Sequence, residues 1–371
     1  MKRMIYIANM RLPTEKAHGI QIMKTCEALS LNGADIELVV PWRFNRLKDN
    51  PFRYYNIQGK FKITTIPSFD FVKLGRIGFL IQSISFSLSV LFYLIFKKAD
   101  IIYSRDEILI FLLSFFRKKL FWEAHMNRYN HIIRRILVKC GGIITITEGL
   151  KNFYISKGAV SDKIAVAPDG IDLSDFPNNF DKNSVRKELG LPLDKKIALY
   201  VGRLDGWKGT ETLFSASKLL PPSIQVVIIG GESKQVSCLK IKYPEVMFLG
   251  FLPYRDLSKN QSVADVLILP NTGKDEISVK FTSPLKLFAY MTSGRPIISS
   301  DLPSLREVLN EENACFFEAD NPKSLTSAIT SILNDKKKQD KISNQALRDI
   351  IKYSWNCRAQ KIISLLFQMM K

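Results

Sequence analysis

Short apolar runs alternate with stretches of helical periodicity along the first half of the chain. Residues 4–8 and 36–40 are mainly apolar runs of strand length, which indicates strands buried within a sheet. Between them, residues 19–32 repeat apolar side chains at the spacing of a helix face. The same alternation predicts further strands at residues 101–103, 120–122 and 143–146, and a helix from Glu148. Strands that alternate with helices form a parallel sheet with right-handed crossovers.

The alternation is interrupted by a turn-rich stretch and then starts again. Residues 167–172 read Ala-Pro-Asp-Gly-Ile-Asp, and more Asp, Pro and Asn residues follow up to position 179, which is typical of a connection between domains. Beyond it the pattern predicts strands at residues 197–201, 224–229, 246–249, 266–269 and 296–298, and helices at 210–220, 283–292 and 322–334. A last helix, residues 355–370, follows when this second pattern is complete.

The two patterns predict an α/β fold with two Rossmann-like, doubly wound domains. We place the first domain at residues 1–172 and the second at residues 173–354, and a length of 371 residues suits two cores better than one. Open parallel sheets bind ligands at the carboxyl ends of their strands. We therefore expect the two domains to face each other across a cleft that holds two substrates.

The charge balance is strongly basic, with a formal net charge of +19. A field of this sign attracts anions such as acidic lipids and phosphorylated small molecules, and a simply solvated cationic surface is the alternative. Basic and aromatic residues are not interleaved as they are on nucleic-acid-binding sheets, so nucleic acid is not an expected partner.

Cysteine usage and the first residues bear on the cellular compartment. The chain has five widely spaced cysteines without a C-x-x-C pair, which argues against a disulfide framework or a zinc site and fits a reducing cytosol. Residues 4–8 are too short an apolar run for a signal peptide, so we expect a cytoplasmic location. Because no H-E-x-x-H or Asp-x-Asp motif is present, we expect neither a metal nor another cofactor.

One uncharged segment, residues 78–96, is long enough to cross a bilayer. Serine and glutamine residues interrupt it, and a crossing would separate strands of one sheet, so a packed amphipathic helix or a helix on a membrane surface is favoured over a span. On a helix, the apolar stripe that we expect to be buried is formed by Leu80, Ile84, Leu88, Leu91, Phe92 and Ile95.

The strongest chemical signal is the decapeptide Tyr-Val-Gly-Arg-Leu-Asp-Gly-Trp-Lys-Gly at residues 200–209. A buried strand is predicted to end at Gly202, and the loop after it carries Arg203 and Lys208. Arg203 can bind a diphosphate through two parallel hydrogen bonds, and Lys208 adds a point charge. The place of this loop at a strand's carboxyl end favours an anion site over a surface turn with two solvated cations.

A second signal is the start of the helix predicted at residues 283–292. Ser283 stands where a cap is expected, Pro284 suits the first helical position, and the free amides around Leu285 are a natural site for a diphosphate. Lys286 lies in the first turn, where the helix dipole disfavours a cation. An anionic ligand explains this placement, and a plain helix start is the alternative.

Two weaker signals lie in the first half. Gly19 opens the first crossover helix, and its amide can meet a phosphate or the acceptor. His125 follows the strand predicted at residues 120–122 and can bind a sugar hydroxyl. A structural histidine with satisfied hydrogen bonds is the alternative for His125.

Taken together, these motifs resemble the retaining nucleotide-sugar glycosyltransferases of the family-four type, which have the GT-B fold. The resemblance covers nearly the whole chain. It rests on residues 17–21, 103–106, 123–125, 168–172, 201–204, 208–209, 283–291, 294–298 and 305–308.

The resemblance implies a role for each matching residue. Arg203 and Lys208 would hold the donor diphosphate together with the amides near Leu285, Gly19 would face the phosphates, and His125 would meet the transferred sugar. The helix within residues 355–371 would return to complete the first domain. The reaction would retain the anomeric configuration without a metal ion, because the leaving phosphate can take the acceptor's proton.

The expected partners follow from the resemblance and from the basic charge. The donor would be a nucleotide sugar, and the acceptor a lipid-linked or growing cell-envelope glycan. The basic clusters and the segment at residues 78–96 suit the anionic inner face of the cell membrane, so we expect a peripheral location there.

The sequence departs from the family at two glutamates. Phe281 and Ala289 occupy the positions of the carboxylates that touch the sugar and the ribose. Asp275 or Glu276 in the preceding loop can replace the sugar contact. Two alternatives to an active transferase therefore stay open: a non-catalytic relative that binds a nucleotide sugar, and a nucleotide-sugar epimerase of the same fold.

Overall fold

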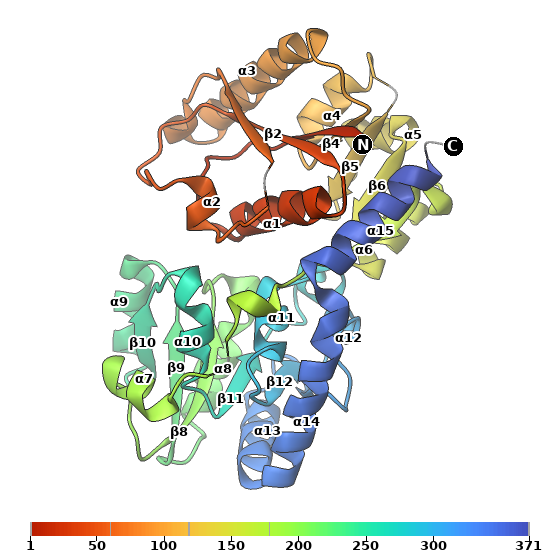
Figure 1. Cartoon of the computed structure of the whole chain (residues 1–371). Coiled ribbons are helices and arrows are strands. Elements are labelled where there is room, and N and C mark those ends of the chain that lie inside the picture. The colour runs from red at the N-terminus through yellow and green to blue at the C-terminus, as the bar shows by residue number, and fades with distance from the viewer. Residues whose placement is uncertain (1, 60, 118, 178, 370–371) are drawn as a thin grey trace. The chain divides into compact units, whose positions relative to one another are not determined.

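The structure, a computed structural model, describes residues 2–59, 61–117, 119–177 and 179–369. The chain divides into two compact units, Met1–Gly170 with Trp355–Lys371, and Ile171–Ser354 (Figure 1). The predicted boundary after residue 172 thus lies close to the point where the chain leaves the first unit. It returns to that unit at Trp355.

The first unit is built on a seven-stranded sheet in which neighbouring strands run parallel, in the order β3-β2-β1-β4-β5-β6-β7. The strand order reverses between β1 and β4, which is where a doubly wound sheet opens a crevice for ligands. The strands are β1 (Arg3–Ile7), β2 (Asp35–Pro41), β3 (Lys62–Ile66), β4 (Ile101–Ser104), β5 (Leu120–Ala124), β6 (Gly142–Thr145) and β7 (Ile164–Val166).

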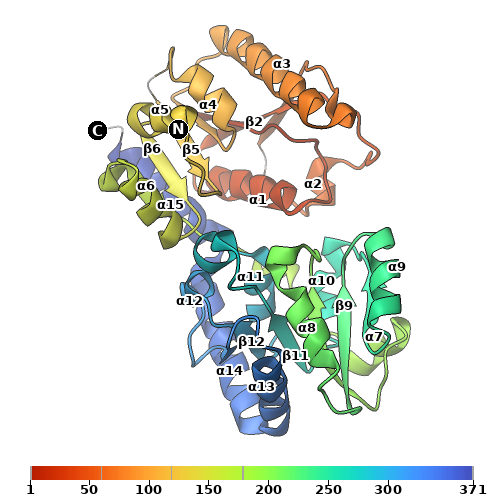
Figure 2. The same ribbon diagram turned by 180° about the vertical axis from the view of Figure 1, so that it is seen from behind.

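Helices cover both faces of this sheet. The helices are α1 (Ala17–Leu31), α2 (Pro51–Tyr54), α3 (Gly75–Ile95), α4 (Glu107–Leu113), α5 (His131–Lys139), α6 (Glu148–Ser156) and α15 (Trp355–Gln368). Helices α1 and α15 pack side by side on one face, and α3 and α4 pack together on the other (Figures 1 and 2). The last helix of the chain therefore belongs to the first unit.

Helix α3 rests on the sheet through a face that mixes polar and apolar side chains. Gln82, Ser83 and Ser87 are buried, together with Phe86, Val90 and Leu94. Gln82 Nε2 donates to Asn9 Oδ1 at 2.9 Å, and Ser87 Oγ donates to the backbone carbonyl of Ser83 at 2.8 Å. Most of the predicted stripe is exposed instead, so the prediction that it is buried is wrong; the exposed members are Leu80, Ile84, Leu88, Phe92 and Ile95.

By length and composition, Val72–Ile95 is the one helical segment in the described parts of the chain that is apolar enough to cross a membrane. The strands before and after it, β3 and β4, belong to the same sheet.

The second unit has a six-stranded sheet with parallel neighbours, in the order β10-β9-β8-β11-β12-β13. Ile197 and Leu199 of β8 enter the core on one face of this sheet, and Ala198 and Tyr200 enter the core on the other. Such a strand is buried on both sides, which explains its unbroken apolar run. The strands are β8 (Lys196–Val201), β9 (Ile224–Ile229), β10 (Met247–Gly250), β11 (Val266–Leu269), β12 (Ile297–Ser300) and β13 (Cys315–Phe317).

The helices of the second unit alternate with its strands, as the sequence pattern predicts. They are α7 (Lys182–Glu188), α8 (Thr210–Ser217), α9 (Ser233–Lys242), α10 (Leu257–Gln261), α11 (Leu285–Met291), α12 (Pro303–Arg306), α13 (Pro322–Asn334) and α14 (Lys336–Asp349). The strand order reverses between β8 and β11, so the crevice of this sheet lies at the carboxyl ends of those two strands.

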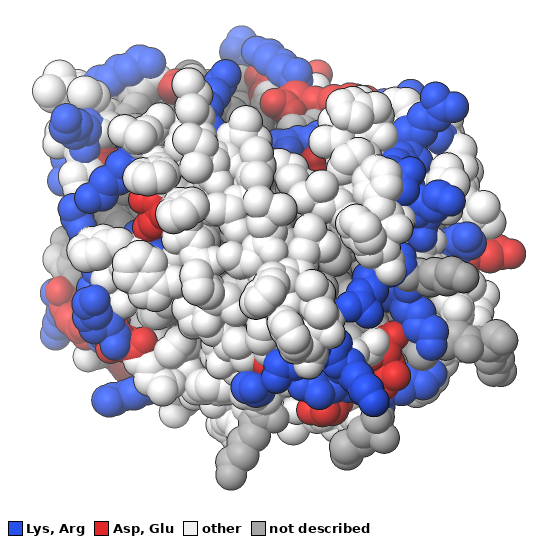
Figure 3. Space-filling view, turned by 90° about the horizontal axis from the view of Figure 1, so that it is seen from above, with Lys and Arg blue, Asp and Glu red and all other residues white. Residues whose placement is uncertain are grey.

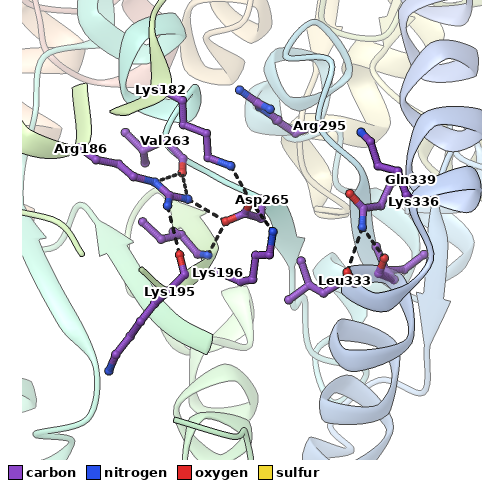
Figure 4. Close-up of polar contacts among 12 residues, drawn as sticks. Lys182, Arg186, Lys195, Lys196, Val263, Asp265, Arg295, Leu333, Lys336 and Gln339 are labelled. Carbon is purple, nitrogen blue, oxygen red and sulfur yellow. Dashed lines mark hydrogen bonds and ion pairs between the residues drawn. The ribbon is translucent and has the colours of Figure 1, made fainter. Parts of the chain in front are cut away.

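Asp265 lies just before β11, at the amino ends of the strands and therefore away from the crevice. It joins α7 to the first residues of β8 (Figure 4). Its carboxylate contacts Lys182 Nζ at 2.5 Å and Arg186 Nη2 at 2.7 Å, and it accepts a hydrogen bond from the Ile197 N–H at 2.7 Å. Burial acts to raise the pKa of Asp265, but the hydrogen bonds from Lys182 and Ile197 outweigh it and lower this pKa. Asp265 is therefore charged at neutral pH and balances the buried Arg186.

We expect Asp265→Asn to lower the free energy of unfolding of the second unit by about 3 kcal/mol, because it leaves the buried Arg186 without a counter-charge. Urea denaturation followed by circular dichroism measures this change. Asp340→Asn is the control, since Asp340 pairs with Lys336 at 2.7 Å on the exposed surface and such pairs contribute about 0–1 kcal/mol. Equal losses in the two variants would contradict the buried role of Asp265.

Candidate anion-binding site

The loops after β8 and β11 meet at the crevice of the second unit. Gly209 has a φ of 66° and lies so close to the second loop that an added Cβ would stand 1.8 Å from the carbonyl oxygen of Pro270. Only glycine fits this position and this backbone conformation. The predicted loop at residues 202–209 therefore closes against the start of the loop at residues 270–284.

Lys286 points back toward the end of β8. Its Nζ lies 3.8 Å from the ring centroid of Tyr200, and an added Cβ at Gly202 would come within 2.8 Å of it. This Nζ is buried and has no hydrogen-bond partner among the residues that the structure describes. Burial lowers the pKa of Lys286 well below its usual value, and nearby Lys208 lowers this pKa further. A buried amine without a counter-ion is unfavourable, so the position favours an anionic ligand.

Lys208 lies beside it in a short 3₁₀ turn, Gly206–Lys208. Its Nζ stands 3.3 Å from the ring centroid of Trp207. Burial lowers the pKa of Lys208 to about 7, with Asp205 opposing this shift and Arg203 adding to it. Arg203 itself is solvent-accessible, with 73% of its side chain exposed, and contacts Asp205 at 3.1 Å. The loop thus carries one solvent-exposed cation, Arg203, and one partly buried amine, Lys208.

Buried polar atoms border this loop, and one of the residues that carry them, Asn271, was not predicted from the sequence. Asn271 follows β11 and is fully buried, yet neither its amide nitrogen nor its oxygen has a hydrogen-bond partner in the described structure. The Ser283 Oγ is likewise buried and unpartnered there. Buried polar groups are normally satisfied, so these atoms indicate a place for a polar ligand. The feature of the sequence that could have revealed Asn271 is its place directly after a buried strand and Pro270.

The start of α11 differs from its prediction. The helix begins at Leu285, Pro284 occupies the cap position with extended backbone, and Ser283 makes no capping hydrogen bond. The prediction that Ser283 caps the helix and Pro284 opens it is therefore wrong. The backbone just before it differs from the prediction as well: residues Ile277–Phe281 form a π-helix, and both Thr282 and Pro284 are extended, so α11 starts one residue after Pro284.

The acidic residues of this loop are engaged within it. Asp275 Oδ1 accepts a hydrogen bond from the Ile277 N–H at 2.8 Å, and Glu276 lies 3.5 Å from Lys280. Phe281 and Ala289 are both buried. The two positions at which the family carries glutamates are thus taken up by the apolar interior here.

In the first unit, Gly19 lies within the first turn of α1 rather than in the loop before it. An added Cβ there would come within 2.3 Å of the Tyr55 hydroxyl. Close packing against Tyr55 is therefore one reason for a glycine at this position. A role for its amide in binding phosphate stays a prediction.

His125 belongs to a buried polar network at the end of β5. Its Nε2 lies 2.5 Å from Glu123 Oε1, and Arg358 of α15 contacts the same carboxylate oxygen at 2.7 Å. Burial lowers the pKa of His125 to about 4, with Arg105 adding to the shift and Glu123 opposing it. The imidazole is therefore neutral at pH 7. The contact with Glu123 agrees with the alternative interpretation, a structural histidine with satisfied hydrogen bonds. A contact between His125 and a sugar stays a prediction.

The same network continues toward residues that the sequence analysis left without a role. Arg105 contacts Gln21, which contacts Asp169. Burial raises the pKa of Asp169 to about 6, against the lowering effect of Arg358 and Arg105. All these side chains come from segments that the resemblance quoted, except Arg358.

In the described residues, no three His, Cys, Asp or Glu side chains gather in a way that would hold a metal ion. The candidate site described above is formed in the second unit by three basic side chains, Arg203, Lys208 and Lys286.

Comparisons with known proteins extend these observations. The family model of glycosyl transferases group 1 matches residues 181–349, which is most of the second unit. An uncharacterized glycosyltransferase of Methanocaldococcus jannaschii is 28% identical over 237 residues, 60% of this chain and 59% of that protein. The N,N'-diacetylbacillosaminyl-diphospho-undecaprenol alpha-1,3-N-acetylgalactosaminyltransferase of Campylobacter jejuni is 26% identical over 235 residues, 62% of this chain and 60% of that protein. The chain thus spans about 60% of the length of these relatives.

Solved structures match over almost the whole chain. Sucrose-phosphate synthase from Thermosynechococcus elongatus has a TM-score of 0.80 at 17% identity, covering 100% of this chain and 99% of that one. Anabaena HepE in complex with UDP-glucose has a TM-score of 0.75 at 16% identity, covering 99% of this chain and 100% of that one. The prediction of two Rossmann-like domains of the GT-B type is confirmed by these likenesses.

Proposed function

We propose that this chain, a member of glycosyl transferases group 1, moves a sugar from a nucleotide-diphosphate donor to a lipid-linked or growing cell-envelope glycan. The observation that carries the proposal is the Nζ of Lys286, which is buried beside Lys208 and has no hydrogen-bond partner in the described structure. It lies at the carboxyl ends of the strands of the six-stranded sheet. A diphosphate supplies the negative charge that both amines lack. Arg203 is exposed and belongs to the same loop as Lys208, so its guanidinium can contact the same diphosphate.

The cations would act on the leaving group. Transfer with retention breaks the bond between the anomeric carbon and the diphosphate oxygen, and the acceptor oxygen bonds to the same carbon on the same face. The acceptor's proton passes to the leaving phosphate oxygen, so the step needs neither a protein nucleophile nor a metal. Charges fixed near the developing diphosphate stabilise the transition state more than the ground state.

The choice of donor and acceptor draws on relatives. HepE was solved with UDP-glucose, and the Campylobacter relative is by its name a transferase acting on a diphospho-undecaprenol acceptor. A nucleotide sugar and a lipid-linked acceptor at the inner face of the cell membrane are accordingly our proposals for this chain. The excess of basic residues favours both partners, since both are anionic.

The second candidate function is binding of a nucleotide sugar without turnover. It is favoured by Phe281 and Ala289, because both are buried and neither offers a carboxylate to a sugar or ribose. In that case the cationic site would still hold a diphosphate.

One experiment separates the candidates. The chain is incubated with UDP-, GDP- and ADP-sugars with and without a lipid-linked acceptor, and the bound nucleotide is identified by mass spectrometry. Sugar transfer to the acceptor supports the proposal. Tight nucleotide binding without turnover of any donor supports the non-catalytic relative, and interconversion of the donor sugar without an acceptor supports an epimerase. If none of the nucleotides binds, the anion-site assignment fails.

We expect donor binding to take up protons and to weaken as the pH rises above about 7. The free Lys208 has a pKa of about 7 and loses its proton above that value, whereas a bound diphosphate raises this pKa and restores the proton. Calorimetry in buffers of different ionisation enthalpy measures the uptake. Lys208→Arg is the control, because arginine keeps its charge and makes the pH dependence shallower. A flat profile for the unmodified chain would contradict the assignment.

A further inference from the structure

The outer face of α3 is apolar and uncovered. Leu88 is 58% exposed and Phe92 is 65% exposed, and Ile84 and Ile95 continue the same face along the helix. The segment at residues 77–96 carries no charged side chain. Figure 3 shows a broad uncharged surface on this side of the molecule, with Lys and Arg at its margins. Burial of such a face by another surface would be strongly favourable.

Aromatic side chains extend this surface beyond the helix. Trp42, Phe44, Phe69 and Phe71 are exposed in the loops after β2 and β3. The loop after β3 lies against the helix, since the Phe69 N–H donates to Ser85 Oγ at 3.0 Å. The loop after β2 is joined to it, since Ser68 Oγ donates to the Trp42 carbonyl at 2.8 Å. A Trp such as Trp42 is typical of the boundary between lipid and water, and exposed Phe side chains suit the lipid side of that boundary.

Basic residues flank both ends of α3. Near its start, Lys73 lies over the Phe44 ring at 5.6 Å, and Lys48 lies over the same ring at 5.8 Å. At its end, a surface pocket of about 390 Å³ is lined by Lys97, Lys98 and Arg117, together with Phe96 and Asp100.

The pocket keeps a cationic surplus. Asp100 accepts a hydrogen bond from the backbone N–H of Arg3 at 2.9 Å, and Arg117 donates to the Leu94 carbonyl at 2.6 Å. Lys97 Nζ lies over the Tyr93 ring at 5.4 Å, and Lys98 is exposed. Cations beside an apolar face match anionic phosphate headgroups above acyl chains.

We propose that α3 and its flanking loops dock the first unit on a bilayer that contains anionic phospholipid, with the helix lying in the membrane plane. Leu88 and Phe92 enter the acyl boundary, and Lys97, Lys98 and Lys73 contact headgroup phosphates. The buried face of α3 explains the arrangement, because Gln82 and Ser83 on that face hydrogen-bond to Asn9 at the end of β1, which leaves the opposite, apolar face for lipid. This inference does not depend on sugar transfer, since lipid binding is measured without a donor.

The test is co-sedimentation of the full chain with phosphatidylcholine vesicles, with and without phosphatidylglycerol. We expect the unmodified chain to bind the anionic vesicles and to bind the neutral ones much more weakly. Leu88→Gln with Phe92→Gln should weaken binding on the order of a hundredfold, because each loses apolar burial in lipid. Lys97→Gln with Lys98→Gln should weaken binding to anionic vesicles on the order of tenfold.

A matched control replaces exposed apolar residues of the second unit. Leu219 and Ile241 are 50% and 85% exposed, and Leu219→Gln with Ile241→Gln should bind vesicles like the unmodified chain. Circular dichroism checks that each variant is folded. Quenching of tryptophan fluorescence by brominated lipid, and its loss in a Trp42→Phe variant, gives a second readout. Unchanged binding by the Leu88 and Phe92 variant, or equal binding to both kinds of vesicle, overturns the proposal. A dimer that this variant dissociates, without vesicle binding, would instead assign the face to a second copy of the chain.

Discussion

Lys208→Ala is expected to lower kcat/KM for sugar transfer by about a hundredfold to a thousandfold, the range seen when one group that stabilises a transition-state charge is removed. Lys208 stands next to Arg203 and the unpartnered Lys286, so its loss removes a charge that the diphosphate needs as it departs. Arg203→Ala should act in the same direction. Steady-state kinetics with the donor found in the panel measure both effects.

The fold should not suffer from the loss of Lys208. Its pKa is about 7 in the folded chain, below its usual value of 10.5, so the unfolded chain binds the extra proton between these values. The penalty for burying Lys208 is therefore greatest below pH 7 and fades as the pH rises toward 10.5. The variant should melt at the same temperature as the unmodified chain or higher at pH 7.

Lys218→Ala is the matched control for this prediction. Lys218 is an exposed lysine of the same unit that lies over an aromatic ring, Tyr243, at 5.0 Å. Its removal should leave the transfer rate unchanged. Normal kinetics in both the Arg203 and Lys208 variants would remove the diphosphate assignment.

Arg358→Met is expected to lower the free energy of unfolding of the first unit by about 3–5 kcal/mol. The side chains of Arg358 and Glu123 are almost fully buried and lie 2.7 Å apart, so the variant leaves a buried carboxylate without its main counter-charge. Arg358 also donates to the Pro168 carbonyl at 3.0 Å, which ties α15 to the end of the first unit's main segment. Thermal or urea denaturation of the first unit measures the loss.

The double variant Arg358→Met with Glu123→Gln tests the electrostatic origin of this loss. Because it removes both charges, it should recover part of the stability that the single variant loses. A double variant that is less stable than the single one would contradict the electrostatic origin of the loss.

Most strands predicted from the sequence are buried on both faces, because their apolar runs are continuous. β10, a partly buried edge strand, was also predicted, from a short apolar run. The edge strand β3 was missed, since its sequence Lys-Ile-Thr-Thr-Ile mixes polar and apolar residues and is only half-buried. β7 and β13 were also missed, because each consists of only three residues and gives no periodic signal. Strand length and edge position thus limited the prediction of the sheets.

Helix α3 shows where a hydropathy pattern misleads. The pattern identifies the helix and its stripe, but it assumes that the apolar side faces the protein. Here Asn9, at the end of β1, offers an amide to the opposite side, and Gln82 and Ser83 bind it. That contact joins residues far apart in the sequence, so periodicity alone does not reveal it.

Two parts of the candidate site were selected from different signals in the sequence. Arg203 and Lys208 were selected because their loop follows a strand, and Lys286 because it lies in the first turn of a helix. The structure brings Lys208 and Lys286 near each other in the second unit. Asn271 and the Arg358 network escaped notice, because their importance lies in burial and in unmatched hydrogen-bonding atoms. These properties depend on the packed fold.

The return of α15 to the first unit has a consequence for how the protein is made. Ile171–Ser354 leaves the ribosome before α15 does, so the inserted unit can finish folding while its host still lacks a helix. Until α15 has been synthesised, the carboxylate of Glu123 in the nascent first unit lacks its ion-pair partner, Arg358. A premature stop just before Trp355 would therefore damage the part of the molecule that was synthesised earliest.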